Sequence, residues 1–261
     1  MNPVAYEFDD GVARIRLCDG ARGNPINQDT VDSLARAVRR ARGDDAHVVV
    51  LTAEGRAFSF GGDVAAFAAP GDTEQRVDDL AETLHRAVSD LHRMNAVVVS
   101  VVHGVAAGAG LSLAAAADLV LAGESARFTL AYTKIGFSPD GGSSLLPASL
   151  GLHRSLRLAL LNPLLTAHEA RDAGLVAEVF PDEALTDGAE AVVTRLRAGS
   201  RDAQVATKRL LRETATPGAE AALRRETLSI RTRAASPDGR EGVAAFLAKR
   251  PPRFPGTALS P

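Results

Sequence analysis

The chain has 261 residues, a formal net charge of −2 and one cysteine. That length can bury one core, or a core plus a helical appendage. Acidic and basic side chains are interspersed, which argues against a nucleic-acid partner, and one cysteine excludes an internal disulfide. The first residues lack the basic end and apolar segment of an export signal, so we expect a cytoplasmic protein.

The first part of the chain alternates predicted strands and helices. Apolar residues alternate with arginines over residues 12–17, which predicts a half-buried strand. Asn27 precedes apolar residues at helical spacing, so we expect it to cap a helix. A second amphipathic helix is predicted over residues 77–91.

Residues 96–117 form a long apolar segment without Asp, Glu, Lys or Arg. A hydropathy window alone would suggest a membrane span. The first half is β-branched, however, the second half is rich in alanine, and glycines lie between them. This pattern predicts a buried strand, a tight turn and a buried helix, and no membrane segment.

Two glycine-rich turns, residues 58–63 and 103–110, follow successive apolar strands. Glycine permits left-handed backbone and close approach of a ligand. If the turns face each other, one N–H from each can hold a carbonyl oxygen that becomes negative during a reaction. The alternative is that each is only a tight turn between a strand and a helix.

The second half of the chain changes from a mixed to an all-helical pattern. Thr166 and Glu169 form a predicted capping box, and a strand is expected over residues 175–180. Four helices should follow, over residues 183–198, 203–213, 219–235 and 241–250. We therefore expect a core domain at residues 1–195, and a helical region with a proline-rich tail at residues 196–261.

Several segments together resemble the crotonase, or enoyl-CoA hydratase/isomerase, superfamily. They lie at residues 48–63, 96–110, 117–122, 137–144, 170–176 and 241–250. The resemblance implies an α/β fold, a spiral of stacked β-β-α units, with C-terminal helices that pack between subunits of a homotrimer or homohexamer. It also implies an acyl-CoA thioester substrate, with coenzyme A as part of that substrate, no separate cofactor and no metal.

The resemblance assigns roles to the two turns. The positions that match the family's carbonyl-binding amides are Phe60 and Ala109. Two glutamates of the family's hydratases are replaced by Ser112 and Tyr132, which are poor bases near neutral pH, so ordinary hydration is disfavoured. Both are candidates for contact with substrate. The alternatives are a buried serine bonded to backbone and a tyrosine ring packed in the pocket wall.

Residues 138–142 resemble the turn that carries the base in 3-enoyl-CoA isomerases and in 1,2-epoxyphenylacetyl-CoA isomerases. Asp140 matches that base, so the chain is closest in motif to the Asp-dependent isomerases. One base suffices to move a proton from C2 to C4 of a 3-enoyl thioester. Apolar surroundings that include Phe137 would raise the pKa of this carboxyl. The alternative is a turn aspartate that caps the next segment.

Further candidates for substrate binding lie at both ends of the chain. Gly62 belongs to the first turn, and Phe137 precedes the Asp140 turn. Arg56 and Lys249 match basic positions that meet coenzyme A phosphates, and Phe246 matches a residue near the adenine. For the two basic side chains, a solvated surface role is the alternative.

Three hypotheses for function follow. The first is an isomerase that converts 3-enoyl-CoA to 2-enoyl-CoA through an enolate. The second is another enolate reaction of the family, such as epoxide-ring isomerisation, or hydration or hydrolysis of an acyl-CoA. The third is a catalytically degenerate acyl-CoA-binding protein, against which the intact glycine turns argue.

Overall fold

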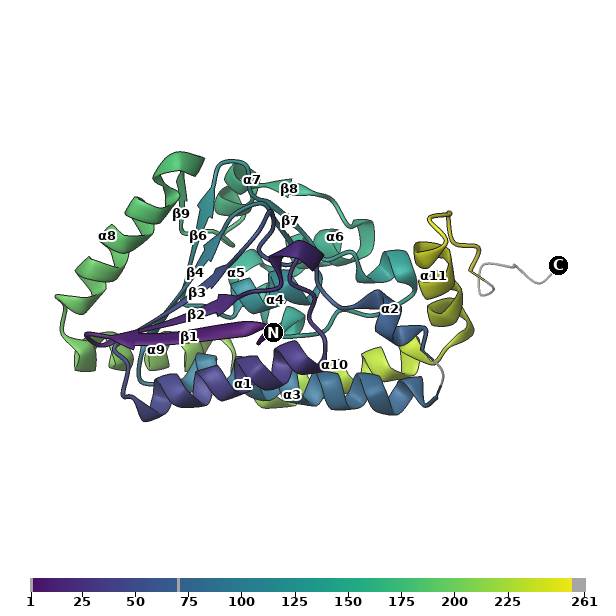
Figure 1. Cartoon of the computed structure of the whole chain (residues 1–261), viewed down its shortest axis with the longest axis horizontal. Helices are drawn as coiled ribbons and strands as arrows, with labels where there is room; N and C mark the ends of the chain where they lie inside the picture. The colour runs from purple at the N-terminus through teal and green to yellow at the C-terminus, as the bar shows by residue number, and fades with distance from the viewer. Residues whose placement is uncertain (1, 70, 255–261) are drawn as a thin grey trace.

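The computed structural model describes residues 2–69 and 71–254. Within these residues, two β-sheets are surrounded by helices (Figure 1). The larger sheet has the order β1-β2-β3-β4-β6-β9, in which β1 is antiparallel to β2 and the other neighbours are parallel. Its strands are β1 (Val4–Asp9), β2 (Val12–Leu17), β3 (Val48–Ala53), β4 (Val97–Val102), β6 (Leu119–Gly123) and β9 (Glu178–Phe180).

Helices cover both faces of this sheet, which is why its central strands are nearly continuous apolar runs. Alternate residues Val49, Leu51 and Val98 pack against α1 (Gln28–Gly43) and α3 (Thr73–Arg93). Their neighbours on the other face pack against α8 (Leu185–Arg197). Figure 1 shows α1, α3 and α10 (Ala219–Ala234) side by side beneath the sheet, with α8 along its other side.

The smaller sheet has the order β5-β7-β8, formed by β5 (Val105–Ala107), β7 (Arg127–Thr129) and β8 (Leu165–Thr166). The apolar segment of residues 96–117 folds as β4, then β5, then α4 (Ala109–Ala115). The predicted strand, turn and helix are thus confirmed, with β5 as an additional short strand. No helix in the described residues is long and apolar enough to cross a membrane.

The predicted caps are present. The Asn27 side chain accepts from the amide of Thr30, and Thr166 forms the full capping box with Glu169 at the start of α7. The remaining helices are α2 (Val64–Phe67), α5 (Pro147–Leu150), α6 (Leu152–Leu161), α7 (Ala167–Asp172), α9 (Arg201–Ala215) and α11 (Pro237–Leu247). Short 3-10 helices are η1 (Gly20–Arg22), η2 (Tyr132–Ile135), η3 (Ser143–Leu145) and η4 (Asp182–Ala184).

Several element boundaries differ from the sequence predictions, and two of the differences have the following form. The strand expected over residues 175–180 begins only at Glu178. The last helix begins at Pro237 rather than at residue 241, because Ser236 caps it and proline fits the first turn, where its missing N–H costs no hydrogen bond.

The C-terminal helices pack onto the rest of the chain. Leu223 and Ile230 of α10 belong to apolar clusters that also contain residues of α3. The expected division at residues 195 and 196 falls in the last turn of α8 and remains a prediction. Residues 255–261 of the expected tail lie outside the described residues.

A buried lysine attaches α9 to the sheet and to α3. The ammonium of Lys208 donates to the carbonyl oxygens of Leu91 and Ala96, each at 2.9 Å, and lies 2.8 Å from Asp118. Asp118 is also 2.7 Å from the guanidinium of Arg212. Lys208 therefore serves two carbonyl oxygens, and it shares the carboxylate of Asp118 with Arg212.

We predict that Lys208→Met lowers the free energy of unfolding by about 2–4 kcal/mol, because buried acceptors lose their partner. Lys134→Met is the matched control, since Lys134 is exposed, and it should change stability by less than about 0.5 kcal/mol. Urea denaturation of both variants measures the difference. Equal stability of the two variants would contradict the prediction.

Candidate active site

The two glycine-rich turns lie directly against each other. The amide of Ser59 donates to the carbonyl of Val105 at 3.1 Å, and the amide of Ala107 donates to the carbonyl of Ser59 at 2.9 Å. A Cβ atom on Gly61 would lie 2.7 Å from the Ala107 oxygen. The turns therefore face each other, which was the condition for a shared carbonyl-binding site.

The amide of Phe60 is not free to serve as a donor. It donates to the carbonyl oxygen of Gly23 at 2.9 Å. The prediction that this amide binds the substrate carbonyl is therefore wrong, because the backbone already uses it. The Phe60 ring instead lines a cavity beside the turn.

Gly62 supplies the free amide of the first turn. The preceding amide, that of Gly61, donates to the Ser59 hydroxyl at 3.1 Å. Within the described residues, no acceptor contacts the amide of Gly62 or that of Ala109. Ala109 is the first residue of α4, where amides have no partner inside the helix. Gly62 and Ala109 therefore offer two free amides at this contact between the turns.

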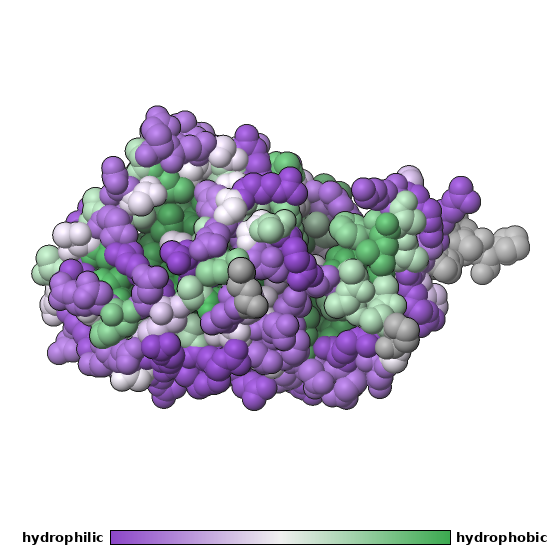
Figure 2. Space-filling model, in the orientation of Figure 1, coloured by the Kyte–Doolittle hydropathy of each residue, from purple (hydrophilic) through white to green (hydrophobic). Residues whose placement is uncertain are grey.

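A cavity of about 470 Å³ opens beside these donors. Its walls come from α2, α3, η2, α10 and α11, and they are mainly apolar, with the rings of Phe67 and Phe137 5.5 Å apart. Figure 2 shows an apolar surface area over α2 and α11. Residues expected at the site that line this cavity are Phe60, Gly62, Ala109, Tyr132, Phe137, Asp140 and Phe246.

Ser112 does not line the cavity and instead lies behind it. Its hydroxyl donates to the carbonyl oxygen of Asp140 at 2.9 Å and lies 2.7 Å from the Ser143 hydroxyl. Tyr132 donates to the same Asp140 carbonyl at 3.1 Å. Burial, followed by the nearby carboxylates, raises the pKa of Tyr132 well above its ordinary value. Both side chains therefore support the backbone that carries Asp140.

The two basic residues expected near coenzyme A lie outside the cavity wall. The guanidinium carbon of Arg56 is 5.2 Å from the centroid of the Phe60 ring, which lines the cavity. Lys249 is exposed just after α11. Arg56 therefore contacts a residue of the cavity lining, although it does not line the cavity itself.

Asp140 lies in a turn that requires glycine. Gly141 and Gly142 have φ angles of 74° and 101°, in the left-handed region. A Cβ atom on Gly141 would lie 3.6 Å from the Cα atom of Ala109. This close packing places the buried Asp140 in the wall of the cavity that the two free amides also line.

Asp140 belongs to a buried cluster of ionisable groups. Nε2 of His85 lies 2.9 Å from Oδ1 of Asp140 and 3.3 Å from Oε2 of Glu226. The other ring nitrogen of His85 lies 3.1 Å from the Thr227 hydroxyl. Oδ1 of Asp140 has no aligned hydrogen bond within the described residues, and the nearby Nε2 atom of His85 is its charge partner when the ring is protonated.

The cluster also fixes the backbone of the Asp140 turn. The carboxylate of Glu226 accepts from the amide of Gly142 at 2.8 Å and from the amide of Ser144 at 2.6 Å. Glu226 lies on α10, far along the chain from this turn. Helix α10 therefore holds the turn in place, because two amides of the turn donate to its charged Glu226 carboxylate.

Burial and mutual contact shift the pKa values of the cluster. Burial raises the pKa of Asp140, and this effect outweighs the contact with His85, which lowers it. Burial alone would lower the pKa of His85, but the contacts with Asp140 and Glu226 raise it to about 9. The three groups interact so closely that they titrate together.

The same cluster invites comparison with a metal site, because its ligand-type atoms lie within 4.8 Å of one another. Both Glu226 oxygens already accept backbone amides, and Thr227 lies against Nδ1 of His85. These contacts favour a set of side chains paired with one another, and no cation is needed to explain the arrangement.

His85 and Glu226 were missed by the sequence predictions. Each lies on an apolar stripe of its helix, His85 between Ala81 and Val88 and Glu226 between Leu223 and Ile230. A charged side chain on a buried stripe requires a partner. That signal was present in the sequence, but it does not identify the partner.

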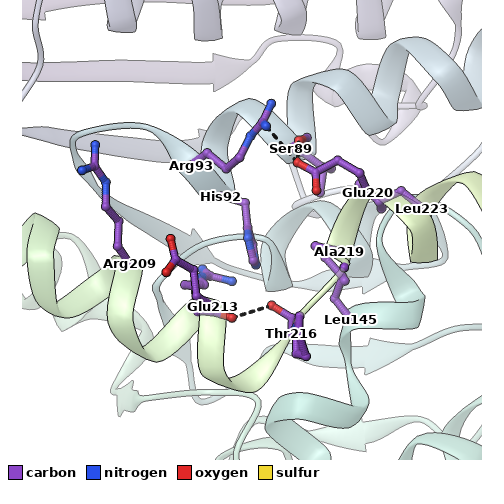
Figure 3. A pocket seen from close by; sticks show the side chains of 14 residues that line it. Ser89, His92, Arg93, Leu145, Arg209, Glu213, Thr216, Ala219, Glu220 and Leu223 are labelled. Atoms are coloured by element: carbon purple, nitrogen blue, oxygen red, sulfur yellow. Dashed lines mark hydrogen bonds and ion pairs between the residues drawn. The ribbon is translucent and has the colours of Figure 1, made fainter.

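A second cavity, of about 460 Å³, lies between α3, α9 and α10 (Figure 3). There Arg93 lies 2.9 Å from Glu220, which also accepts from Ser89 (Figure 3). Burial, with a smaller effect from Arg212, lowers the pKa of His92 to about 4. Arg93 and Arg212 of this cavity are paired with carboxylates and its histidine is neutral, whereas the first cavity is lined by two free amides and a buried carboxyl. The first cavity is therefore the candidate active site.

Free amides beside a buried carboxyl suit an enzyme that stabilises an oxyanion and moves a proton. Comparison with known proteins agrees with this class: residues 7–257 match the model of the enoyl-CoA hydratase/isomerase family, to which the chain belongs. The two sheets and C-terminal helices are the crotonase fold, so the predicted fold class is confirmed.

Individual relatives resemble the chain over nearly its whole length. A probable enoyl-CoA hydratase of Rhodobacter capsulatus is 37% identical, covering 97% of this chain and 98% of that protein. A 1,2-epoxyphenylacetyl-CoA isomerase of Escherichia coli is 34% identical, covering 98% and 99%. The crystal structure of an enoyl-CoA hydratase from Mycobacterium avium subsp. paratuberculosis has a TM-score of 0.87 and 33% identity, covering 94% and 99%.

We predict that Gly61→Ala lowers the free energy of unfolding by about 2–4 kcal/mol, because it combines a left-handed backbone with a clash against Ala107. Gly43→Ala is the control, since a Cβ there meets no atom within 4 Å and alanine favours the helix. Thermal and urea unfolding compare the two. A Gly61→Ala protein as stable as the parent would show that the turns can separate without cost.

Proposed function

We propose that this enzyme is an acyl-CoA isomerase that converts a 3-enoyl thioester to a 2-enoyl thioester. The observation that carries the proposal is the position of Asp140, a buried carboxyl in the wall of the cavity that the free amides of Gly62 and Ala109 also line. The other acid of that wall in the described residues, Asp63, is paired with Arg22 at 2.8 Å.

The proposed reaction needs one base and one oxyanion site. The thioester oxygen accepts from Gly62 and Ala109, and Asp140 removes a proton from C2. The electron pair of that C–H bond forms a dienolate, whose charge rests on the oxygen held by the two amides. The protonated Asp140 then gives the same proton to C4, which leaves the double bond between C2 and C3. Each donor contributes about 3 kcal/mol in the transition state.

Hydration is less well supported by the same site. It requires one group to deprotonate water and another to protonate carbon. Ser112 and Tyr132 instead donate hydrogen bonds to the Asp140 carbonyl, and the pKa of Tyr132 is raised, which keeps its proton in place. A relative named as a hydratase and one named as an isomerase are similarly identical to the chain, so sequence identity does not separate the two reactions. The choice between them therefore rests on the site residues, which favour isomerisation.

Epoxide-ring isomerisation is the second candidate reaction. It is favoured by the likeness to the 1,2-epoxyphenylacetyl-CoA isomerase and would use the same carboxyl and amides. A degenerate acyl-CoA-binding protein is the third reading, but it has no need of two free amides beside a base. For the coenzyme A end we propose Arg56, Phe246 and Lys249, of which Phe246 lines the cavity.

We predict that Asp140→Asn lowers isomerisation by about 10²–10⁴-fold, because the base is lost while the shape is kept. Affinity for the acyl-CoA should change little. A screen of 3-enoyl, 2-enoyl, aryl and epoxide acyl-CoA thioesters measures turnover, and calorimetry measures binding.

Asp63→Asn is the matched control at the same cavity, and Ser112→Ala tests the support behind it. Both should cost much less activity than Asp140→Asn. If Asp140→Asn keeps turnover within a few-fold of the parent, another group moves the proton. If neither the parent protein nor Asp140→Asn turns over any thioester, but both bind one, the protein is better described as a degenerate acyl-CoA-binding protein.

We also propose that the enzyme is a homotrimer or homohexamer. Large apolar side chains are exposed along and just after α6, and they include Leu152, Leu156, Leu160, Leu161 and Leu164. Exposed apolar patches of this kind mark contact surfaces.

Light scattering of the purified protein should therefore give the mass of three or six chains. Leu156→Glu with Leu160→Glu should shift that mass downward, because charges resist burial in an interface. A monomer of the parent protein would contradict the proposal.

A further inference from the structure

The cluster of His85, Asp140 and Glu226 has more parts than a single base requires. Three separate elements bring it together: α3 carries His85, the turn after η2 carries Asp140, and α10 carries Glu226. All three side chains are at least nine-tenths buried. Burying several ionisable groups is costly unless each has a partner, so their arrangement has a physical reason.

Glu226 binds the backbone of the turn that carries Asp140. Its two oxygens accept from two amides of the turn, those of Gly142 and Ser144, at 2.8 Å and 2.6 Å. These bonds fix the backbone on the C-terminal side of Asp140. Ser112 and Tyr132 fix the Asp140 carbonyl itself. The position of the carboxyl group is therefore determined by contacts from three directions.

His85 has the geometry of a charge partner. Nε2 lies within 3.3 Å of oxygens from both carboxylates, and Nδ1 faces the Thr227 hydroxyl. The amide of Gly141 also approaches Nε2, at 3.2 Å, which suits a neutral ring only. Two negative oxygens at this range favour a proton on Nε2 over one amide dipole.

We propose that His85 and Glu226 are positioning residues for the base: Glu226 fixes the turn that carries Asp140, and a positively charged His85 keeps the Asp140 carboxylate ionised inside an apolar cavity. The proposal rests on the proposed function, because it gives Asp140 the role of base. It assigns neither His85 nor Glu226 a contact with substrate.

Other charged groups on the helices packed around His85 form ion pairs away from its ring. Asp140 and Glu226 face the ring, and the Tyr132 hydroxyl donates to the carbonyl oxygen of Asp140. At the interface of α3 and α10, the remaining ion pairs are engaged near the surface: Arg224 with Glu82, Arg231 with Asp78 and Glu74, and Arg93 with Glu220. On the side of α1, Arg42 lies 3.6 Å from Asp90. Asp140 and Glu226 are thus the charges that govern His85.

The first test is the pH dependence of kcat/KM in the His85→Gln variant. Without a positive charge beside it, a buried Asp140 next to Glu226 binds its proton more tightly. The acid limb should therefore move to higher pH by about 1–3 units, and activity should recover toward alkaline pH. A merely structural role would lower the rate at every pH and leave the limb in place, which would overturn the proposal.

His92→Gln is the matched control. His92 is also a buried histidine of α3, but it lines the second cavity and not the first. The same substitution there should leave the acid limb unmoved. An equal shift in both variants would mean that any change in α3 moves the limb, and this too would overturn the proposal.

The second test uses the ligand-free protein and does not depend on activity. Proton NMR of the histidine rings, with His85 assigned from the His85→Gln spectrum, should show His85 still protonated at pH 8. In Glu226→Gln, His85 should lose its proton at lower pH, because one of two carboxylates is gone. A neutral His85 in the parent protein at pH 7 would overturn the proposal.

Two outcomes separate this proposal from its alternatives. If His85 titrates as expected but no enoyl thioester is turned over, the proposed reaction fails and the charge pairing stands. If a chelator abolishes activity and zinc restores it, the same atoms bind an ion and the positioning role is overturned.

Discussion

Backbone pairing between the two glycine turns is the constraint on which the site depends. Ser59 exchanges hydrogen bonds with Val105 and Ala107, and Gly61 leaves no room for a side chain against the Ala107 carbonyl. This contact joins the segment that follows β3 to β5, a strand of the smaller sheet. It also decides which amides are left over, since every amide used in pairing is lost to a ligand. Gly62 and Ala109 keep free amides within the described residues, whereas the amides of Phe60 and Ala107 are already bonded.

Local sequence patterns predicted the elements well and the site only in part. The strand at residues 12–17, the Asn27 cap and the capping box at Thr166 follow from spacing within a few residues. The amide of Phe60 could not be assigned in this way, because its partner Gly23 lies in a distant segment. Likewise, His85 and Glu226 meet only because α3 and α10 pack together, and helical periodicity does not say which faces meet.

Asp140 shows how one position can satisfy two readings of a sequence. It is a turn residue, since two left-handed glycines follow it, and it is also the buried carboxyl at the cavity. The turn supplies the geometry and the helices supply the environment. Burial raises the pKa of its carboxyl, while the contact with His85 opposes that rise. The balance between these effects, rather than either one, sets its chemistry.

The location of Glu226 has a consequence for the synthesis of this protein. The turn that carries Asp140 is completed by a residue on α10, and His85 waits for a partner 142 positions later in Thr227. Contacts of such long range close slowly, because the intervening chain must first lose its freedom. A chain still emerging from the ribosome can form its sheets early, yet it acquires the complete buried cluster of His85, Asp140 and Glu226 only near the end of translation.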